Sequence, residues 1–510
     1  MPGCNLLPKV RTADLLKLLE LGNSVAEHDA ALERYFVETA TFDAIVEDKA
    51  DIVAGDKGTG KTALFRILQR RYTTIEQLHD VEVLAAFNPV GSPVFHRLTE
   101  GEPLEEGQYI SLWKGYFLAL AGNWLLELYV DAPTECMREL DDLLQSIGLR
   151  SNDDSPNTIF SQLFNLFRRL LNPSASEVSL SPTPNGLPVI AARMEYADPT
   201  DAEGREPEFV SHDDALALLN RCLGEIDVTL WLALDRLDEA FAGFPKAEIP
   251  ALRALLRTYL DLNAFDRIRL KLFLRNDLFR RVAVDQQFVN LSHVNARKVE
   301  IVWDEADLYD LLYRRIKEND AFMESLLPEG AGAEQTFAVV FPEQVDAGSR
   351  KPTTWRWIMG RIADGNGLKP PRNLIDLVQK AQEEESRAQN RRPADYTTDQ
   401  PVIGSESLKK GLTRLSQERV QDTLLAEAGD YASLIDRFRN QKAEHNLATL
   451  GEVLGVTAAE VPTRAAILVE LGFLEPIGAN WKVPMLYRQG LGITQGKAFA
   501  PEEQGDEDEE

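Results

Sequence analysis

The residues with the clearest chemical pattern run from Gly55 to Thr62 and read G-D-K-G-T-G-K-T. They fit G-x-x-x-x-G-K-[ST], the phosphate-binding P-loop. Glycines let the backbone turn tightly and bring its N–H groups to a phosphate. Lys61 can reach the β- and γ-phosphates of a nucleotide, and the Thr62 hydroxyl can bind Mg²⁺. The predicted phosphate-contacting residues are Gly55, Asp56, Lys57, Gly58, Thr59, Gly60, Lys61, Thr62 and Ala63.

The segments on either side of this loop give the motif the setting that it requires. Residues 50–54 are short and β-prone, and residues 63–68 have an amphipathic helical pattern. A strand, a glycine-rich loop and a helix must follow one another in that order. The alternative is a glycine turn with an exposed lysine, which needs no such setting. We therefore expect ATP and Mg²⁺ to bind here.

A second motif is an apolar run that ends in an acid. Residues 229–235 read T-L-W-L-A-L-D, which indicates a buried parallel strand with Asp235 at its C-terminal edge. Ligands bind at that edge in open α/β sheets. Asp235 is predicted to hold Mg²⁺ with Thr62, and Asp238 or Glu239 to orient and deprotonate the attacking water. The alternative is a strand-capping aspartate followed by solvated acids.

A third apolar run, residues 270–277, also ends in polar side chains. Arg275 or Asn276 at its end is predicted to sense the γ-phosphate, and the alternative is a surface arginine. Arg280 and Arg281 follow on a helix. They could supply an arginine finger to a neighbouring subunit, but a solvated basic face is favoured.

A further candidate arginine lies in residues 367–377, which read G-L-K-P-P-R-N-L-I-D-L. The two prolines end one element, and Arg372 opens a helix. From a helical lid, Arg372 could reach the nucleotide. The alternative is an ordinary surface arginine at a helix N-terminus.

The charge balance restricts the partners. The chain has 510 residues and a formal net charge of −27, from 55 basic and 82 acidic residues. Seven of the acids lie in the last ten residues, which predicts a solvated, disordered acidic tail. Such a surface repels phosphate backbones, so a nucleic-acid contact would need a local basic patch.

Cysteine usage and hydropathy suggest a compartment. Cys4, Cys136 and Cys222 have no C-x-x-C spacing and no histidines at metal spacing. This predicts a reducing cytoplasm, without disulfides or structural zinc. No signal segment is expected at the N-terminus. The most apolar stretch, residues 109–130, contains Lys114, Asn123 and Glu127, which favours a buried helix over a membrane span.

The predicted fold class is α/β: a parallel-sheet P-loop NTPase core with a helical insertion, a helical lid and a C-terminal winged-helix domain. Helices are expected over residues 13–19 and 30–42, ahead of the P-loop strand. The expected organisation is an N-terminal helical segment (1–46), a P-loop core (47–300) with a helical insertion (110–172) and a long loop (173–210), a helical lid (301–390), a linker (391–405), a helical and winged-helix domain (406–495), and the acidic tail (496–510).

The C-terminal region suggests a helix–turn–helix over residues 446–471, followed by a two-stranded wing over 472–484. Such domains often bind DNA. Here the second helix carries Arg464, but also the acidic Glu460 and Glu470. With so little basic charge, protein contact or a structural cap is favoured over DNA.

The motifs in order are G-D-K-G-T-G-K-T, a long helical insert, L-W-L-A-L-D-R-L-D-E, L-K-L-F-L-R-N-D-L-F, P-P-R-N-L-I-D-L and a winged helix. This set resembles a bacterial P-loop ATPase family related to the STAND and KAP NTPases, within the AAA+-like ASCE assembly. The resemblance covers the chain from about residue 30 to residue 490. It implies ATP and Mg²⁺ binding, oligomerisation, and a regulatory or conflict-system role that includes anti-phage defence.

The chain departs from that pattern at two places. AAA+ ATPases usually place glutamate directly after the Walker B aspartate, where this chain has Arg236. Slow hydrolysis is therefore plausible. Many KAP members carry membrane segments in the insert, which is too polar for that in this chain.

The favoured function is an ATP-driven switch that works through conformational change, self-association or a protein effector. One alternative is a nucleic-acid-dependent ATPase, a loader or motor that uses the winged helix. Another is a scaffold that binds ATP without turnover.

Overall fold

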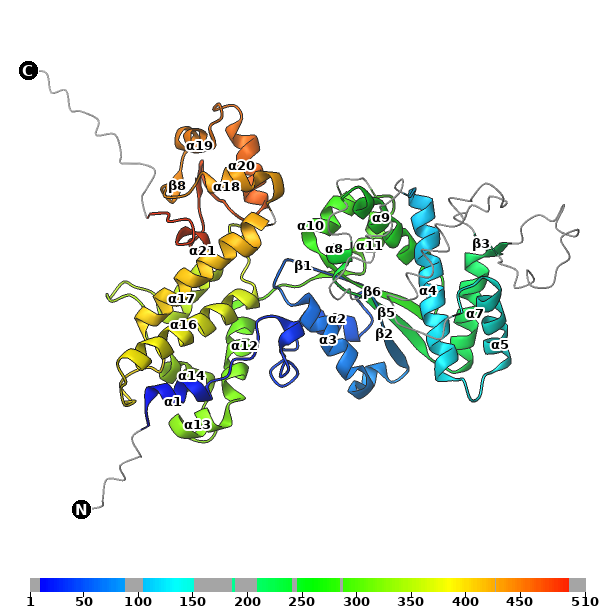
Figure 1. Ribbon diagram of the computed structural model, residues 1–510, viewed down its shortest axis with the longest axis horizontal. Helices are drawn as coiled ribbons and strands as arrows, with labels where there is room; N and C mark the ends of the chain where they lie inside the picture. Colours follow the sequence, from blue (N-terminus) through cyan, green and yellow to red (C-terminus); the bar gives the residue numbers. More distant parts are fainter. Residues whose placement is uncertain are drawn as a thin grey trace, which may run out of the picture. The chain divides into compact units, whose positions relative to one another are not determined.

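The computed structural model describes residues 10–87, 104–150, 186–188, 209–240, 245–284, 288–426 and 428–494. The chain forms two compact units. The first, which we call the helical unit, combines Met1–Val37 with Trp303–Glu510. The second, the sheet unit, is Glu38–Val302. Each unit has its own hydrophobic core, and each is described by itself (Figure 1).

The sheet unit is built on a five-stranded sheet with the order β2-β5-β6-β1-β7 (Figure 1). All of its neighbouring strands run parallel. The strands are β1 Ile52–Gly55, β2 Val81–Phe87, β5 Thr229–Leu234, β6 Ile268–Arg275 and β7 Lys298–Glu300. The predicted α/β class with a parallel sheet is confirmed.

The apolar runs form these strands because the central strands are covered on both faces. All four residues of β1 are buried, and β5 is buried from Leu230 to Leu234. Continuous apolar runs are typical of parallel strands between two helical layers. Strand β6 lies between β1 and β5, so the P-loop strand and the strand ending before Asp235 are second neighbours.

Helices cover the sheet and share its core. Those of the sheet unit are α2 Ala40–Val46, α3 Lys61–Arg71, η2 Tyr72–Thr74, η3 Glu76–Leu78, α4 Glu106–Leu128, α5 Glu135–Ser146, α7 His212–Glu225, α8 Leu237–Ala240, α9 Pro245–Leu262, α10 Asn276–Phe279, the π-helix η6 Arg280–Val284 and α11 Leu291–Asn295.

Helix α4 corresponds to the most apolar stretch of the chain, and it is a buried helix as predicted. Its Lys114 is buried and pairs with Asp261 at 2.7 Å and with Asp213 at 3.3 Å. Within the described ranges, no helix combines the length and the apolar character needed to cross a membrane. Helices α4, α5 and α7 pack into the same core as the sheet. They are therefore part of the sheet unit's core, where the sequence suggested an inserted subdomain.

The region between α5 and α7 is described only in part. The part of the expected helical insertion (110–172) that follows residue 150 lies outside the described residues. Within the expected long loop, β3 (Gly186–Pro188) pairs antiparallel with β4 (Phe209–Ser211). The described part of the expected loop thus includes β3 and the start of β4.

The expectation that the chain contains no disulfide is wrong. Cys136 on α5 and Cys222 on α7 form one, with their Cα atoms 5.5 Å apart. Both side chains are buried where α5 packs against α7 (Figure 1). This pairing could not be predicted from the sequence spacing, because the two cysteines are 86 residues apart and come together only when the helices pack. The argument for a reducing compartment therefore loses its basis.

The helix expected over residues 30–42 is also wrong. Residues 31–35 form turns, and α2 begins only at Ala40. The Asp29 carboxylate accepts hydrogen bonds from the Ala31 backbone (3.3 Å) and from the Tyr35 hydroxyl, and it pairs with Arg315. Such side-chain bonds to the backbone compete with helix formation. The predicted first helix is present as α1, Thr12–Leu18.

A network of charged side chains, with Asp51 and Lys271 buried at its centre, lies near the starts of β1 and β7 and the middle of β6. Lys271 Nζ lies 2.8 Å from the Asp51 carboxylate and 4.0 Å from the centre of the Trp231 ring. Arg297 also pairs with Asp51, and the Tyr259 hydroxyl donates to it at 3.0 Å. Burial opposes the charge of Asp51, but Arg297 and Lys271 hold its pKa below the usual value. The network therefore consists of paired charges, which is how charges are tolerated in a core.

The helical unit has a second core that joins the segment expected as a lid to the C-terminal region. Helices α16 and α17 pack directly against each other (Figure 1). Besides α1, the elements of this unit are η1 Ala26–His28, α12 Glu305–Lys317, α13 Asp320–Leu326, α14 Ala333–Val340, α15 Thr354–Ile362, α16 Pro371–Arg391, α17 Ser405–Glu418, the π-helix η7 Arg419–Leu425, η8 Gly429–Tyr431, α18 Ala432–Asp436, α19 Leu447–Leu454, α20 Val461–Glu470 and α21 Met485–Arg488.

The C-terminal elements lie where the sequence predicted them. Helices α19 and α20 are followed by strands β9 (Glu475–Ile477) and β10 (Asn480–Lys482). A third strand, β8 (Glu444–His445), pairs with β10 and completes a small sheet of order β8-β10-β9. The acidic tail expected over residues 496–510 lies outside the described residues.

Candidate functional site

The predicted P-loop connects the end of β1 at Gly55 to the start of α3 at Lys61. Gly58 and Gly60 have φ values of 79° and 104°. Residues with a side chain rarely adopt such angles, so glycine is required at both positions. The backbone N–H groups at the start of α3 have no acceptor within the helix, and they form the positive end of the helix dipole. This local structure fits an anion such as a phosphate.

Lys61 is held close to the loop. Its ammonium group donates to the carbonyl oxygens of Gly55 at 2.7 Å and Asp56 at 2.9 Å. The Thr59 hydroxyl donates to the same Asp56 carbonyl at 2.8 Å. The loop therefore positions its own lysine beside the N-terminus of α3. Lys57, Thr62 and Ala63 lie in the loop or in the first turn of α3, as expected from the motif.

Asp235 follows the last residue of β5 and is 1% exposed. It lies at the carboxyl edge of the sheet, the edge from which the P-loop also leaves. One strand separates β5 from β1, so the two chain segments are about 10 Å apart at this edge. Mg²⁺ usually takes one or two protein ligands and keeps waters or phosphate oxygens as the others. Thr62 and Asp235 are suitable in chemistry and in number for such a site.

The described part of the chain contains no group of three or more histidine, cysteine, aspartate or glutamate side chains that could hold a metal ion by themselves. A site made from Thr62, Asp235 and phosphate oxygens does not need such a group.

Arg236 and Glu239 form an ion pair directly after Asp235. Arg236 Nε lies 2.6 Å from Glu239 Oε1. The Arg236 backbone has a φ of 58°, which is unusual for a residue other than glycine. Glu239, one of two predicted bases, therefore already has a cationic partner. Asp238, the other, lies in α8, and its side chain is outside the described residues.

The two predicted γ-phosphate sensors differ in their contacts. Arg275 pairs with Asp277, with nitrogen–oxygen distances of 2.9 and 3.2 Å. Asn276 instead donates from Nδ2 to the Asp56 carboxylate of the P-loop at 3.2 Å. Burial raises the pKa of Asp56, while Asn276 and Lys61 act in the opposite direction. The structure thus brings Asn276, more directly than Arg275, to the phosphate-binding loop.

Arg372 lies in the first turn of α16, in the helical unit, and is partly buried. The neighbouring side chain, Asn373, donates to the Ile362 carbonyl at 2.9 Å and accepts from Arg419 at 2.7 Å. Arg419 also pairs with Asp376 on the same helix. These contacts fix the start of the helix that carries Arg372, whose role toward a nucleotide stays a prediction.

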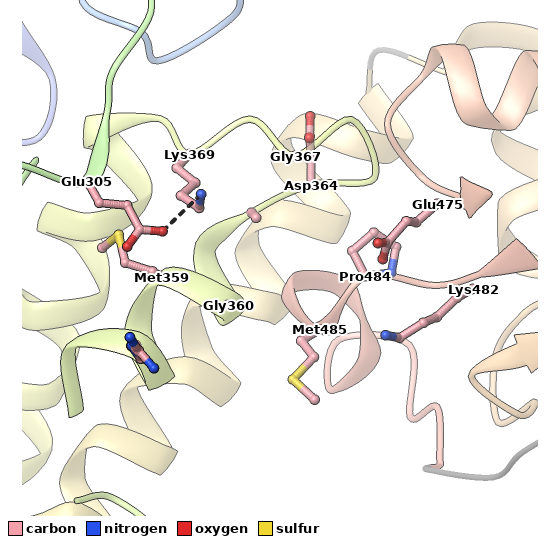
Figure 2. A pocket seen from close by; sticks show the side chains of 12 residues that line it. Glu305, Met359, Gly360, Asp364, Gly367, Lys369, Glu475, Lys482, Pro484 and Met485 are labelled. Carbon is pink, nitrogen blue, oxygen red and sulfur yellow. Dashed lines mark ion pairs between the residues drawn. The ribbon is translucent and has the colours of Figure 1, made fainter. Parts of the chain in front are cut away.

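A pocket lies beside the loop that leads into α16 (Figure 2). Its volume is about 520 Å³. Figure 2 shows Lys369 pointing toward Glu305, 3.2 Å away, while Lys482 and Glu475 come from the two strands β10 and β9. The loop is tied to the C-terminal sheet region, because Gly365 N–H donates to the Gly472 carbonyl at 2.7 Å.

Two contacts in the sheet unit were not expected from the sequence. Asp56 was predicted as a phosphate-contacting residue of the P-loop, but it is also the partner of Asn276. Arg236 was noted as a departure from the AAA+ pattern, but it is the partner of Glu239. The spacing of three residues between Arg236 and Glu239 could have indicated the second contact. No sequence signal linked Asp56 to Asn276, because they are 220 residues apart.

Comparisons with known proteins give limited similarity. No protein-family model matches the chain. A curated protein of Escherichia coli (strain K12), named "Putative transposon gamma-delta 80.3 kDa protein", is 23% identical over 303 residues. The match covers 58% of this chain but 39% of that protein, so the chain spans well under half of the length of this relative.

Among solved structures, similar chains belong to origin recognition complex (ORC) proteins. The Aeropyrum pernix ORC2 protein in its ADPNP–ADP complexes is 12% identical with a TM-score of 0.37, covering 89% of this chain and 93% of that chain. The Aeropyrum pernix ORC1 protein in complex with DNA is 13% identical with a TM-score of 0.32, covering 94% and 96%. TM-scores below 0.5 do not establish a common fold, so the fold assignment rests on the strand order described above.

Proposed function

We propose that this protein binds ATP with Mg²⁺ and hydrolyses it slowly as part of a molecular switch. The observation that carries the proposal is the arrangement at one sheet edge. The P-loop leaves β1, Asn276 at the end of β6 contacts that loop, and Asp235 ends the next strand. Open α/β sheets bind ligands at this edge.

Each residue at this edge has a distinct proposed role. Backbone N–H groups of the P-loop and the Lys61 ammonium would neutralise the phosphates. The Thr62 hydroxyl and the Asp235 carboxylate would hold Mg²⁺, which supplies further positive charge to the phosphates when it is bound. Asn276 would donate a hydrogen bond to the γ-phosphate in place of its bond to Asp56.

Hydrolysis requires a base that takes a proton from water. Glu239 is the proposed base, and Asp238 is the alternative. Because Arg236 pairs with Glu239, the carboxylate would have to leave this partner to contact the attacking water. This pairing supports slow turnover. A scaffold that binds ATP without turnover is the limiting case of the same arrangement.

The switch would operate through the helical unit. Arg372 is proposed to respond to the γ-phosphate, so that hydrolysis changes the state of the segment that begins at α16. The output would be self-association or contact with a protein effector. A role in a mobile-element or defence system is supported by the resemblance to the STAND and KAP ATPases and by the transposon protein that matches part of the chain.

The test is ATP binding by the full chain and by two variants, measured by calorimetry with and without Mg²⁺. We expect Lys61→Ala to weaken ATP binding at least tenfold, and Asp235→Asn to weaken binding only when Mg²⁺ is present. Lys49→Ala is the control, since it removes an exposed lysine outside the loop. Unchanged affinity in both Lys61→Ala and Asp235→Asn would overturn the proposal.

A second candidate function is a nucleic-acid-dependent ATPase. The observation that favours it is the helix pair α19 and α20 followed by strands β9 and β10, an order typical of winged-helix domains. Against it, Arg464 on α20 is accompanied by the exposed Glu470 on the same helix. An ATP hydrolysis rate that rises with added DNA or RNA, and that loses this response in Arg464→Ala, would favour this candidate over the switch.

A further inference from the structure

The helical unit contains a second, smaller pocket whose lining is mostly basic. It has a volume of about 250 Å³ and lies among α15, α17 and the residue after α21. Its lining residues are Asp346, Trp357, Arg361, Lys409, Lys410, Leu412, Thr413 and Gln489. Three of them are cations and one is an acid, although the whole chain has a net charge of −27. A basic pocket on a strongly acidic protein requires an explanation.

The pocket in Figure 2 provides a comparison, because α15 and the region of α21 line both pockets. In that larger pocket the charges balance: Arg356, Lys369 and Lys482 accompany Glu305, Asp364 and Glu475. In the smaller pocket Asp346 is the single acid of the lining. The excess of positive charge is therefore specific to the smaller pocket.

Asp346 already serves several donors. Its carboxylate accepts from Trp357 Nε1 at 3.1 Å, and it lies 3.4 Å from Lys409 Nζ and 3.8 Å from Arg361. Lys409 has a second partner in Glu406, at 3.1 Å. The Arg361 guanidinium donates to the Trp357 carbonyl at 3.2 Å and lies 4.2 Å from the centre of the Trp357 ring. Asp346 is thus shared among these donors and does not neutralise the pocket.

A further arginine increases the positive charge from within the protein. Arg488 on α21 is 7% exposed, and its Nε donates to the Val483 carbonyl at 2.8 Å. Its Nη2 atom is buried and has no hydrogen-bond partner among the described residues. Burial lowers the pKa of Arg361, Asp346 acts in the opposite direction, and the nearby charge of Arg488 lowers that pKa further. Two guanidinium groups held close together are destabilising unless an anion lies between or beside them.

We propose that this pocket, which we call the basic pocket, binds a small phosphate-bearing anion through Arg361, Lys409 and Lys410. Arginine is suited to phosphate because its planar group offers paired donors. Thr413 and Gln489 can add neutral hydrogen bonds. The volume of about 250 Å³ suits inorganic phosphate or a small phosphate monoester. This site lies in the helical unit and is separate from the proposed ATP site, on which it does not depend.

In the experiment, inorganic phosphate is titrated into the full chain carrying Lys61→Ala, and binding is measured by calorimetry. This background weakens phosphate binding at the P-loop. We expect a dissociation constant below about 1 mM. Adding Arg361→Gln or Lys410→Gln should weaken binding at least tenfold, whereas the matched control Lys351→Gln, an exposed lysine outside the pocket, should leave it unchanged. Thermal unfolding by circular dichroism checks that each variant is folded. If Arg361→Gln does not fold, the test rests on Lys410→Gln, because Lys410 is exposed.

Three results would overturn the proposal. One is no phosphate binding by the Lys61→Ala chain at millimolar concentration. Another is equal loss of binding in Lys351→Gln and Lys410→Gln. The third is tighter binding of a twelve-nucleotide single strand to the basic pocket than of inorganic phosphate or AMP. That result would assign the basic pocket to nucleic acid. Unchanged ATP affinity in both Lys61→Ala and Asp235→Asn would refute the proposed function and leave the basic pocket unaffected.

Discussion

Arg236 has a backbone conformation that side chains usually avoid, with φ at 58°. A left-handed conformation costs roughly 1–2 kcal/mol for residues other than glycine. Its ion pair with Glu239 is partly exposed, since the two side chains are 26% and 44% accessible. An exposed pair contributes only about 0.2–1 kcal/mol. The pair by itself therefore does not offset the backbone cost, which suggests that the position serves function.

The first prediction at this scale concerns Arg236→Asn. Asparagine tolerates the left-handed backbone, so the substitution removes the guanidinium without disturbing the turn. We expect ATP turnover to rise about threefold to tenfold, because Glu239 is released from its ion pair and can contact the attacking water. Phosphate release at saturating ATP measures the effect. Arg236→Lys, which keeps the charge, is the control, and a rise that persists in the double variant with Glu239→Gln would refute the explanation.

The second prediction at the residue scale concerns the buried pair of Asp51 and Lys271, each with a side chain 1% accessible. Asp51→Asn leaves the charge of Lys271 poorly compensated and should destabilise the protein by about 3–5 kcal/mol. Asp14→Asn, which removes an exposed partner of Lys17, is the matched control and should cost at most about 0.5 kcal/mol. Denaturant unfolding measures both.

The same pair gives a pH dependence whose sign follows from its pKa. The pKa of Asp51 is lower in the folded protein than its usual value. Its contribution to stability is therefore complete above the unfolded pKa, about 3.9, and is lost as the pH falls through the lower folded pKa. The free energy of unfolding should drop below about pH 4 in the natural chain, and this part of the drop should be absent in Asp51→Asn.

At the scale of elements, the loop before α16 and the turn before β9 approach each other very closely. A Cβ atom at Gly365 would lie 2.6 Å from the Leu474 carbonyl oxygen and 2.8 Å from the Gly472 carbonyl oxygen. Both are backbone atoms, which cannot rotate away. The helix that carries Arg372 is thus joined by its leading loop to the C-terminal sheet region through backbone contact.

Gly365→Ala is therefore expected to destabilise the helical unit by about 1–3 kcal/mol, because the loop or the turn must shift. Gly360→Ala is the matched control: it lies in α15, where an added Cβ would meet no atom within 4 Å. Alanine is also the better helix former, so this control should be neutral or slightly stabilising. Equal melting temperatures for the two variants would contradict the role of the close contact.

Most elements near the proposed site could be predicted from the sequence, because they depend on local patterns. Apolar runs predicted β1, β5 and β6, and the glycine spacing predicted the turn into α3. What local patterns could not supply is pairing over long separations. Asn276 meets Asp56, and Cys136 meets Cys222, only because helices and strands pack. The prediction of a helix over residues 30–42 was wrong for the same reason, because the distant Arg315 helps to hold Asp29 in a turn.

At the scale of the whole molecule, two separate hydrophobic cores predict two unfolding events. One core lies within the sheet unit and the other within the helical unit. We expect calorimetry to show two transitions. ATP with Mg²⁺ at one hundred times its dissociation constant should stabilise the sheet unit by about 2.7 kcal/mol. For a unit of this size, its melting temperature should then rise by roughly 5–10 °C.

Variants separate the contributions of the two units. Lys61→Ala should reduce the ATP-dependent rise at the same ATP concentration. If Arg372 responds to the nucleotide, ATP should also raise the second transition, and Arg372→Ala should remove that part alone. A single unfolding transition in the natural chain and in every variant would contradict the independence of the two cores. An ATP-dependent rise in melting temperature confined to the helical unit would contradict the proposed ATP site in the sheet unit.

The disulfide between α5 and α7 has a topological consequence for the proposed site. The P-loop precedes Cys136 in the chain, whereas Asp235 and Asn276 follow Cys222. The disulfide therefore links the two halves of the site covalently, in addition to the backbone between the two cysteines. If the backbone were cut once anywhere between the two cysteines, both halves would remain one molecule until a thiol reduced the bond. New chain ends or an inserted reporter domain could thus be placed in that interval without separating Lys61 from Asp235.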